Sequence, residues 1–149
     1  MKRYYAYENF REDTKKLMQK VEKFEPEAIV AIARGGYTLA HAMAEGLHIR
    51  DLQSIRTELY DGDQKRDELS LFGMCDFGVK RVLVVDDIAD SGKTMAFIME
   101  YLTKEFPDVS FASATLFYKK SSLYEPDFWV NEADMWIEFF WEKDFGAAV

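Results

Sequence analysis

Residues 82–94 constrain the fold and the function of this chain more than any other segment. Four apolar residues, 82–85, run directly into two adjacent carboxylates, Asp86 and Asp87. Asp90 and a short hydroxyl-rich turn follow, and further apolar residues then recur with the period of a helix. This order predicts a buried strand, a loop and the start of a helix. Ligands of open α/β sheets bind at such junctions, because the carboxyl ends of strands meet the amino ends of helices there.

The turn and the paired acids suit different parts of one ligand. Residues 90–94 offer backbone N–H groups, hydroxyls and a helix dipole, which together attract a phosphate. Carboxylates repel phosphate, so we expect Asp86 and Asp87 to face sugar hydroxyls or a phosphate-bound divalent metal ion. A ligand that presents a phosphate, a ribose diol and Mg²⁺ together is a phosphoribosyl group.

The same segment also ends like a P-loop, because residues 92–94 read Gly-Lys-Thr. The P-loop pattern G-x-x-x-x-G-K-[ST] requires glycine at its first position, where this chain has Asp87. A carboxylate there would lie close to a triphosphate, and the P-loop is therefore excluded. The remaining alternative without a ligand is an ordinary acidic loop after a buried strand.

Residues 82–94 closely resemble the phosphoribosyl-pyrophosphate (PRPP) binding motif of the type I phosphoribosyltransferases. The resemblance implies that Asp86 and Asp87 hold the ribose hydroxyls and that Asp90 is the catalytic general base. It also implies a cradle for the ribose and the 5-phosphate, made of Ala89, Asp90, Ser91, Gly92, Lys93 and Thr94. Mg²⁺ is the implied cofactor, with Asp87 as its ligand, either directly or through water.

A second set of residues follows the first apolar run of the chain. Residues 28–33 are all apolar and predict a buried parallel strand, after which come Arg34, Gly35 and Gly36. This turn and the acidic motif should therefore reach the same edge of the sheet. An arginine among glycines suits an anion that also approaches backbone N–H groups. In the phosphoribosyltransferases the corresponding loop holds the pyrophosphate of PRPP, which implies that role for these three residues.

The C-terminal third is similar to the bacterial xanthine-guanine phosphoribosyltransferases. Lys119 follows a predicted strand over residues 110–118, and Trp136 lies in an aromatic-rich tail. The resemblance implies that Lys119 contacts the 6-oxo group of a purine and that Trp136 stacks on the base. The backbone around Ile137, together with Glu138, would then face the 2-position. An ammonium group can hold a 6-oxo acceptor, and an indole can cover a flat base.

The resemblance implies transfer of the 5-phosphoribosyl group from PRPP to a 6-oxo purine in purine salvage, with pyrophosphate released. The sequence does not rank guanine, xanthine and hypoxanthine. Two alternatives stay open: a PRPP-binding regulator, and a phosphoribosyltransferase that acts on a different base. Residues 60–78 are expected to hold a mobile segment, with 61–67 as a loop or ribbon, that closes over the site and excludes water.

The pattern of elements predicts an α/β fold with a mainly parallel central sheet flanked by helices. We expect one domain, residues 1–149, with a core over about residues 1–120 and a small base-binding hood over about residues 121–149. Apolar spacing predicts the following segments: helix 10–24 ended by Pro26, strand 28–33, helix 37–45 with Gly46 as its C-cap, a strand near 53–58, strand 82–85, helix 95–105 and strand 110–118.

Composition excludes several classes of protein. The formal net charge of −8 argues against nucleic acid as a partner, and no apolar run approaches the length of a membrane span. The single cysteine, Cys75, cannot form an internal disulfide, which favours a reducing cytoplasm. His41 and His48 fit no metal site and are expected to be structural. The expected partners are PRPP and a purine base, and the family resemblance favours a homodimer or homotetramer.

Overall fold

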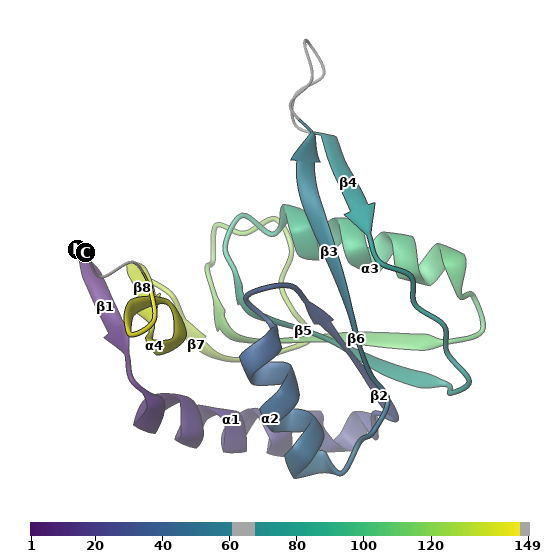
Figure 1. Ribbon diagram of the computed structural model, residues 1–149, viewed down its shortest axis with the longest axis horizontal. Coiled ribbons are helices and arrows are strands. Elements are labelled where there is room, and N and C mark those ends of the chain that lie inside the picture. Colours follow the sequence, from purple (N-terminus) through teal and green to yellow (C-terminus); the bar gives the residue numbers. More distant parts are fainter. Residues whose placement is uncertain (61–67, 147–149) are drawn as a thin grey trace.

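The computed structural model describes residues 1–60 and 68–146, and its centre is a six-stranded sheet (Figure 1). All neighbouring strands run parallel except β3 and β4, which are antiparallel. The order across the sheet is β4 (Glu68–Phe72), β3 (Leu52–Tyr60), β2 (Ala28–Ile32), β5 (Arg81–Ala89), β6 (Ser110–Tyr118) and β7 (Phe128–Glu132). The predicted mainly parallel α/β fold is confirmed.

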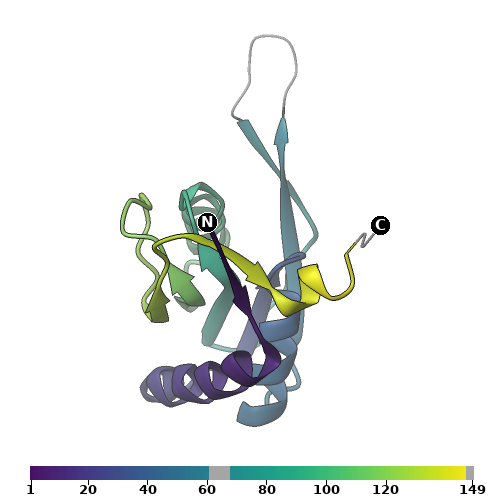
Figure 2. The ribbon, with the colours of Figure 1, turned by 90° about the vertical axis from the view of Figure 1, so that its left-hand side faces the viewer.

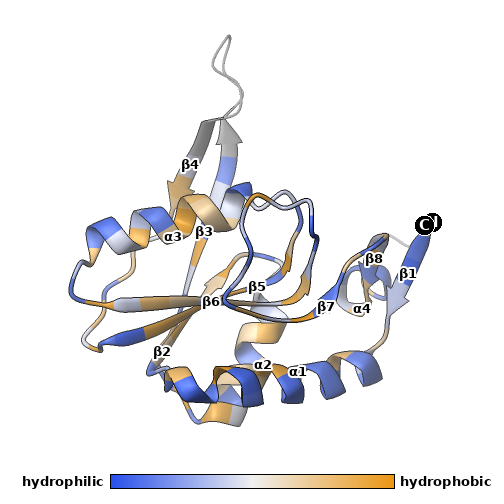
Figure 3. Cartoon of the chain, turned by 180° about the vertical axis from the view of Figure 1, so that it is seen from behind, coloured by the Kyte–Doolittle hydropathy of each residue, from blue (hydrophilic) through white to orange (hydrophobic). Residues whose placement is uncertain are grey.

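Helices cover both faces of this sheet. Helix α1 (Tyr7–Val21) packs on β6 and β7, and α2 (Tyr37–Leu47) packs on β2 and β5. Helix α3 (Lys93–Glu105) covers the opposite face. Figure 3 shows hydrophobic residues in the central strands and mixed hydropathy along the helices, as expected where each helix buries only one side. Two buried apolar clusters result, one on each face of the sheet.

A second, two-stranded sheet lies beside the first (Figure 2). It pairs β1 (Lys2–Tyr5) in parallel with β8 (Trp136–Phe139), which leads into the short helix α4 (Phe140–Lys143). These three elements are not predicted from the sequence, because each is too short to show a period. The pairing also joins the two ends of the chain, which no local pattern reveals.

The boundary of α2 differs from the prediction. Gly46 lies inside α2 rather than at its C-cap, and the helix ends at Leu47. His48 adopts the left-handed conformation with φ 59°, and its N–H caps the carbonyls of Ala44 and Glu45. A Cβ atom at Gly46 would overlap the Met18 sulfur of α1. A larger residue at Gly46 would require the flexible end of the Met18 side chain to move, so this glycine contributes to helix packing and not to a turn.

The acidic motif also lies in a different element from the one expected. Strand β5 continues beyond residue 85 through Ala89, so that Asp86 and Asp87 belong to the strand and not to a loop. The reason is the pairing with β6, where Asp86 lies opposite Thr115 and Ala89 opposite Tyr118. Helix α1 likewise begins earlier than predicted and passes into a 3₁₀ turn, η1 (Glu22–Phe24), before Pro26.

The segment predicted to be mobile is only partly described. Residues 61–67 lie outside the described residues. Residues 68–72 form β4, which pairs antiparallel with β3, and the two strands extend beyond the rest of the sheet (Figures 1 and 2). Residues 68–72, within the segment predicted to be mobile, therefore form a strand of the central sheet. Within the described residues, no helix combines the length and the apolar character needed to cross a membrane.

Candidate active site

The Arg34 loop and the acidic strand meet at one edge of the sheet. Strands β2 and β5 are parallel neighbours, with Ala31 opposite Val85. A Cβ atom built on Gly35 would lie 2.5 Å from Asp87 Oδ2. Only glycine therefore lets the Arg34 loop approach the carboxylate this closely. The predicted convergence of the two motifs is confirmed.

Asp86 and Asp87 form an acidic centre in which Asp87 is buried and Asp86 is half-buried. The side chain of Asp87 is only 8% exposed, and its N–H donates to Asp86 Oδ1 at 2.8 Å. Burial raises the pKa of Asp87 to about 6. Burial, followed by the charge of Asp87, raises the pKa of Asp86 well above its ordinary value. Across the described part of the chain, no lysine or arginine forms an ion pair with either carboxylate.

A small hollow lies where β5 leads into α3. It has a volume of about 110 Å³ and is lined by Asp86, Ile88, Ala89, Asp90, Ser91, Gly92, Thr94 and Met95. Gly92 has φ +86°, a conformation that L side chains rarely adopt. The Ser91 carbonyl accepts from the N–H of Leu123 at 2.9 Å, which ties this turn to the loop after β6. A rigid turn at the start of a helix suits a bound phosphate.

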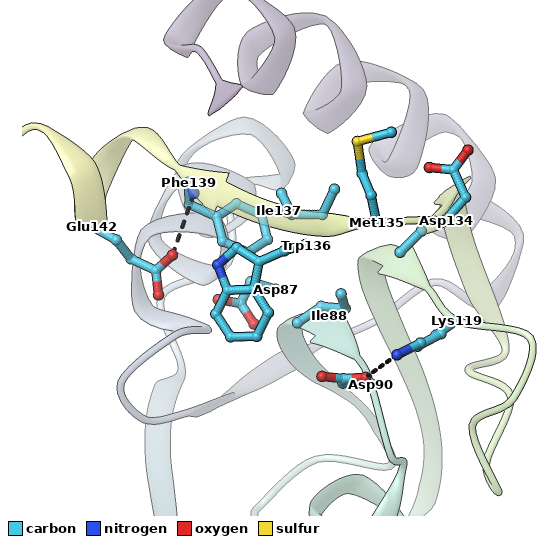
Figure 4. A pocket seen from close by; sticks show the side chains of 11 residues that line it. Asp87, Ile88, Asp90, Lys119, Asp134, Met135, Trp136, Ile137, Phe139 and Glu142 are labelled. Atoms are coloured by element: carbon cyan, nitrogen blue, oxygen red, sulfur yellow. Dashed lines mark hydrogen bonds and ion pairs between the residues drawn. The ribbon is translucent and has the colours of Figure 1, made fainter. Parts of the chain in front are cut away.

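A larger cavity of about 350 Å³ opens beside Asp90 (Figure 4). Asp90 Oδ1 lies 3.4 Å from Lys119 Nζ, so the ends of β5 and β6 place an acid and a base side by side. Trp136, which is 63% exposed, and Ile137 lie across the cavity on β8. The cavity thus combines a polar floor with an apolar wall that is open to a flat ligand.

A third hollow surrounds the Arg34 loop. It has a volume of about 690 Å³ and is lined by Arg34, Gly35, Trp141, Glu142, Phe145 and Gly146. Glu142 also lines the cavity beside Asp90, and Asp90 in turn lines the hollow before α3. The three spaces therefore adjoin along the edge of the sheet.

Most of the predicted site residues line these three spaces, and three do not. Lys93 is the first residue of α3 and lines none of the spaces. Gly36 packs against the backbone, where a Cβ would lie 2.5 Å from the Val85 carbonyl oxygen. Glu138 pairs with Lys2 of β1 at 3.7 Å and does not line the cavity.

The cavity beside Asp90 is also lined by residues that are not predicted from the sequence. They are Ile88, Ala133, Asp134, Met135, Phe139 and Glu142. Glu142 is the most informative, because it accepts a hydrogen bond from the N–H of Phe139 at 3.3 Å and its charge further raises the pKa of Asp87. Its position depends on the single turn of α4, and no periodicity in the sequence points to that turn.

Comparison with known proteins decides the family. The sequence matches the family model of the phosphoribosyl transferase domain over residues 2–145. The chain belongs to this family. The resemblance seen in residues 82–94 is thereby confirmed, and the sheet with its flanking helices is the type I phosphoribosyltransferase fold.

Three similar proteins place this phosphoribosyltransferase more closely. A xanthine-guanine phosphoribosyltransferase of Idiomarina loihiensis is 33% identical over 122 residues, which cover 78% of this chain and 71% of that protein. The structure of a Helicobacter pylori xanthine-guanine-hypoxanthine phosphoribosyltransferase is 35% identical, with a TM-score of 0.90 and coverage of 97% and 96%. A purine phosphoribosyltransferase of Pyrococcus horikoshii is 27% identical, with a TM-score of 0.84 and coverage of 94% and 93%.

Proposed function

We propose that this phosphoribosyltransferase transfers the 5-phosphoribosyl group from PRPP to a 6-oxo purine, giving a nucleoside monophosphate and pyrophosphate in purine salvage. One observation carries the proposal. Three spaces adjoin one another: the hollow before α3, the cavity beside Asp90 with its aromatic wall, and the hollow around the Arg34 loop. PRPP and a purine need these environments side by side. The names of the Idiomarina and Helicobacter relatives support a purine as the acceptor.

The PRPP half of the site is divided among three groups. Asp86 and Asp87 accept hydrogen bonds from the ribose hydroxyls. The 5-phosphate lies in the hollow before α3, where Ser91, Gly92 and Thr94 line the space and the start of the helix favours an anion. The pyrophosphate lies in the Arg34 hollow, because a guanidinium binds phosphate oxygens in a bidentate manner.

The pairing of Asp90 with Lys119 favours a 6-oxo purine. Atoms N7 and O6 lie next to each other on one edge of the purine ring. With the ring attached through N9, Asp90 accepts from N7–H while Lys119 donates to O6, which the 3.4 Å spacing of the two groups allows. Adenine carries an amino donor at position 6, which would face the Lys119 donor. Trp136 covers one face of the base, and the backbone of Ile137 lies toward its 2-position.

The chemistry is a displacement at C1 of the ribose with oxocarbenium character, as in other glycosyl transfers. Asp90 acts as a general base and removes the N7 proton while N9 of the purine attacks C1 of the ribose. Arg34 and the backbone N–H groups of its loop stabilise the charge of the leaving pyrophosphate. The walls of the cavity hold the base on the opposite face of the sugar from the leaving group.

We further propose Mg²⁺ as the cofactor, bound to Asp87 directly or through water. The fit is chemical, because two neighbouring carboxylates without a basic partner can hold a hard cation. Within the described residues, no group of three or more His, Cys, Asp or Glu side chains could surround a metal ion. Water and PRPP oxygens would complete the ligand set, as is usual for Mg²⁺. When bound, the ion neutralises charge on the pyrophosphate.

A spectrophotometric assay tests the proposal. Wild-type protein is mixed with PRPP, Mg²⁺ and one of four bases: guanine, xanthine, hypoxanthine or adenine. We expect turnover of 6-oxo purines and not of adenine. Asp90→Asn should lower kcat by about 10²- to 10⁴-fold, since the general base is lost. Asp108→Asn is the matched control, because Asp108 is exposed in the turn before β6, at the opposite edge of the sheet.

Each outcome of the assay has a distinct meaning. Equal turnover of adenine would contradict the role of Lys119. Equal activity of Asp90→Asn and wild type would contradict Asp90 as the base. No turnover with any purine, together with PRPP binding, would replace the purine assignment by another acceptor or by a regulatory role.

We also propose the organisation of the whole chain. A single domain has its core over about residues 1–120 and a base-binding hood over about residues 121–149. The contribution of β8 and α4 to the cavity supports the hood, although β7 is part of the central sheet. We propose a homodimer or homotetramer that acts in the cytoplasm, without nucleic acid as a partner. The charge of −8 and the single cysteine support the last two points.

A further inference from the structure

The wall of the cavity beside Asp90 belongs to a sheet that is separate from the central one. Trp136, Ile137 and Phe139 of β8 line this cavity, while Asp90 and Lys119 come from the ends of β5 and β6. Among the strands of the described residues, β8 pairs with β1 alone, with Trp136 opposite Lys2 and Phe139 opposite Tyr5. The width of the cavity therefore depends on how β1 is attached to the rest of the molecule.

Tyr5 makes the buried part of this attachment, next to Arg3, whose guanidinium carbon lies 5.6 Å from the centroid of the Phe117 ring. The Tyr5 side chain is 0% exposed, whereas the other residues of β1 are exposed. Its ring packs edge-on against Phe117 of β6 at 5.0 Å between centroids and against Phe139 of β8 at 5.6 Å. Phe117 lies two residues before Lys119, so Tyr5 is wedged between the strand that carries the lysine and the strand that carries Trp136.

A polar network fixes the orientation of the Tyr5 ring. The Tyr5 hydroxyl donates to Asp13 Oδ2 of α1 at 2.6 Å. The same oxygen accepts from Asn131 Nδ2 of β7 at 2.8 Å, and Asn131 also donates to the Leu116 carbonyl of β6 at 3.3 Å. One buried carboxylate thus joins the small sheet to a helix and to two strands of the central sheet. A shared, buried acceptor of this kind makes the contributions of its donors interdependent.

We propose that the Tyr5–Asp13–Asn131 network positions β8 and so determines the affinity of the enzyme for its base, without contributing to the binding of PRPP. The three side chains are positioning residues, because none of them lines the cavity. Their effect reaches the base through Phe139 and the β1–β8 pairing. The inference rests on the proposed function, since it assigns the cavity to the purine.

The kinetic test uses Tyr5→Phe, which removes the hydroxyl and keeps the ring. We expect KM for the base to rise about tenfold, while KM for PRPP stays at the wild-type value. The control is Ile98→Val, which removes one buried carbon from the core on the other face of the sheet. Loss of stability alone should not raise KM for the base selectively. An unchanged KM for the base in Tyr5→Phe, or a parallel rise for both substrates, would overturn the proposal.

Hydrogen–deuterium exchange of the free protein provides a test that needs no substrate. Tyr5→Phe should speed the exchange of the amides of β8 about tenfold and leave those of β5 unchanged. The control Ile98→Val should not speed the exchange of β8. Exchange of β8 at the wild-type rate in Tyr5→Phe would contradict the network. This readout keeps the two ideas apart, because an absence of purine turnover would refute the proposed function and not the attachment of β8.

Asn131→Ala supplies a second variant that leaves Tyr5 intact. It should raise KM for the base in the same selective way. In the double variant Tyr5→Phe/Asn131→Ala the combined rise should be smaller than the product of the single effects, because both donors share Asp13 Oδ2. Independent, multiplicative effects would mean that the two residues do not act through one carboxylate.

Discussion

Asp86 and Asp87 lie on β5 at a point where burial disfavours a negative charge. A carboxylate without a basic partner can accept hydrogen bonds from sugar hydroxyls or bind a cation. The same burial destabilises the fold. Binding residues that lower the stability of the ligand-free state are common at active sites. The acidic centre should therefore be visible in the pH dependence of unfolding.

We predict that Asp87→Asn raises the free energy of unfolding of the ligand-free protein near neutral pH, by about 1–3 kcal/mol. The pKa of Asp87 is about 6 in the folded state and lower in the unfolded chain, so the folded state binds the proton more tightly. The contribution of Asp87 to stability is thus full in acid and is lost as the pH rises through about 6. Urea unfolding over a pH series measures this.

The advantage of Asp87→Asn should disappear as the pH falls toward about 4, where Asp87 is protonated in the folded protein. Asp108→Asn, an exposed acid, serves as the control and should change little at any pH. A variant that is less stable than wild type at neutral pH would show that hydrogen bonds of the Asp87 carboxylate outweigh its burial.

We also predict that Lys119→Ala raises KM for 6-oxo purines by roughly 10- to 100-fold, because a hydrogen bond to a charged donor is lost. The preference for 6-oxo purines over adenine should be weaker in Lys119→Ala than in the wild type. Lys120→Ala is the matched control, since the neighbouring lysine is exposed and pairs with Glu132 at 3.7 Å. Steady-state kinetics with each base distinguish the two variants. Equal effects of the two substitutions on KM would contradict the contact of Lys119 with the 6-oxo group.

At the scale of elements, the turn between β5 and α3 packs tightly against the loop that follows β6. A Cβ atom on Gly92 would collide with Ser122 Oγ and would lie 2.7 Å from the Tyr124 amide nitrogen. The loop after β6 therefore presses directly on the turn before α3. The hollow before α3 and the cavity beside Asp90 share the lining residues Ile88 and Asp90, so a displaced turn would affect both.

We predict that Gly92→Ala lowers the free energy of unfolding by about 1–3 kcal/mol and raises KM for PRPP, because the side chain is strained at positive φ and displaces the loop. Gly78→Ala is the control, since no atom lies within 4 Å of a Cβ there. Thermal unfolding and PRPP titration measure both effects. Normal PRPP kinetics in Gly92→Ala would indicate that the turn does not hold the phosphate.

At the scale of the whole molecule, the site is assembled from distant parts of the chain. The central sheet supplies the acids, the turns and Lys119, while the small β1–β8 sheet supplies the aromatic wall. Several large apolar side chains remain exposed outside the cavity: Tyr37, Leu52, Phe72, Met74 and Leu123. Association with another copy of the chain would remove such side chains from water, which is favourable.

We predict that sedimentation velocity at micromolar concentration shows a species of two or four chains, since association would bury these apolar side chains. Dilution should weaken association if the interface is small. Substituting Tyr37 or Leu52 by a charged residue should shift the distribution toward the monomer. A monomer at all concentrations would contradict the proposed homodimer or homotetramer.

The sequence by itself determined the inner strands of the central sheet and the placement of the acidic motif and the Arg34 loop at their carboxyl ends. The apolar runs of β2, β5 and β6 are predicted because strands buried on both faces leave a local pattern. Asp86, Asp87 and Asp90 follow such a run directly, and Arg34 follows another, so their meeting at one edge follows from parallel pairing. Each strand and the turn after it are neighbours along the chain, so the local order of residues is sufficient to predict where these side chains lie.

Only the tertiary structure decided the remaining parts. The pairing of β1 with β8 joins Tyr5 to Phe139, and the Asp13 network joins α1 to Asn131. β1 and β8 are short and have no period, and both the strand pairing and the Asp13–Asn131 contact join residues more than a hundred positions apart. Glu142 enters the cavity for the same reason. Contacts between distant, non-periodic segments are decided by the packing of the whole chain, which no local pattern encodes.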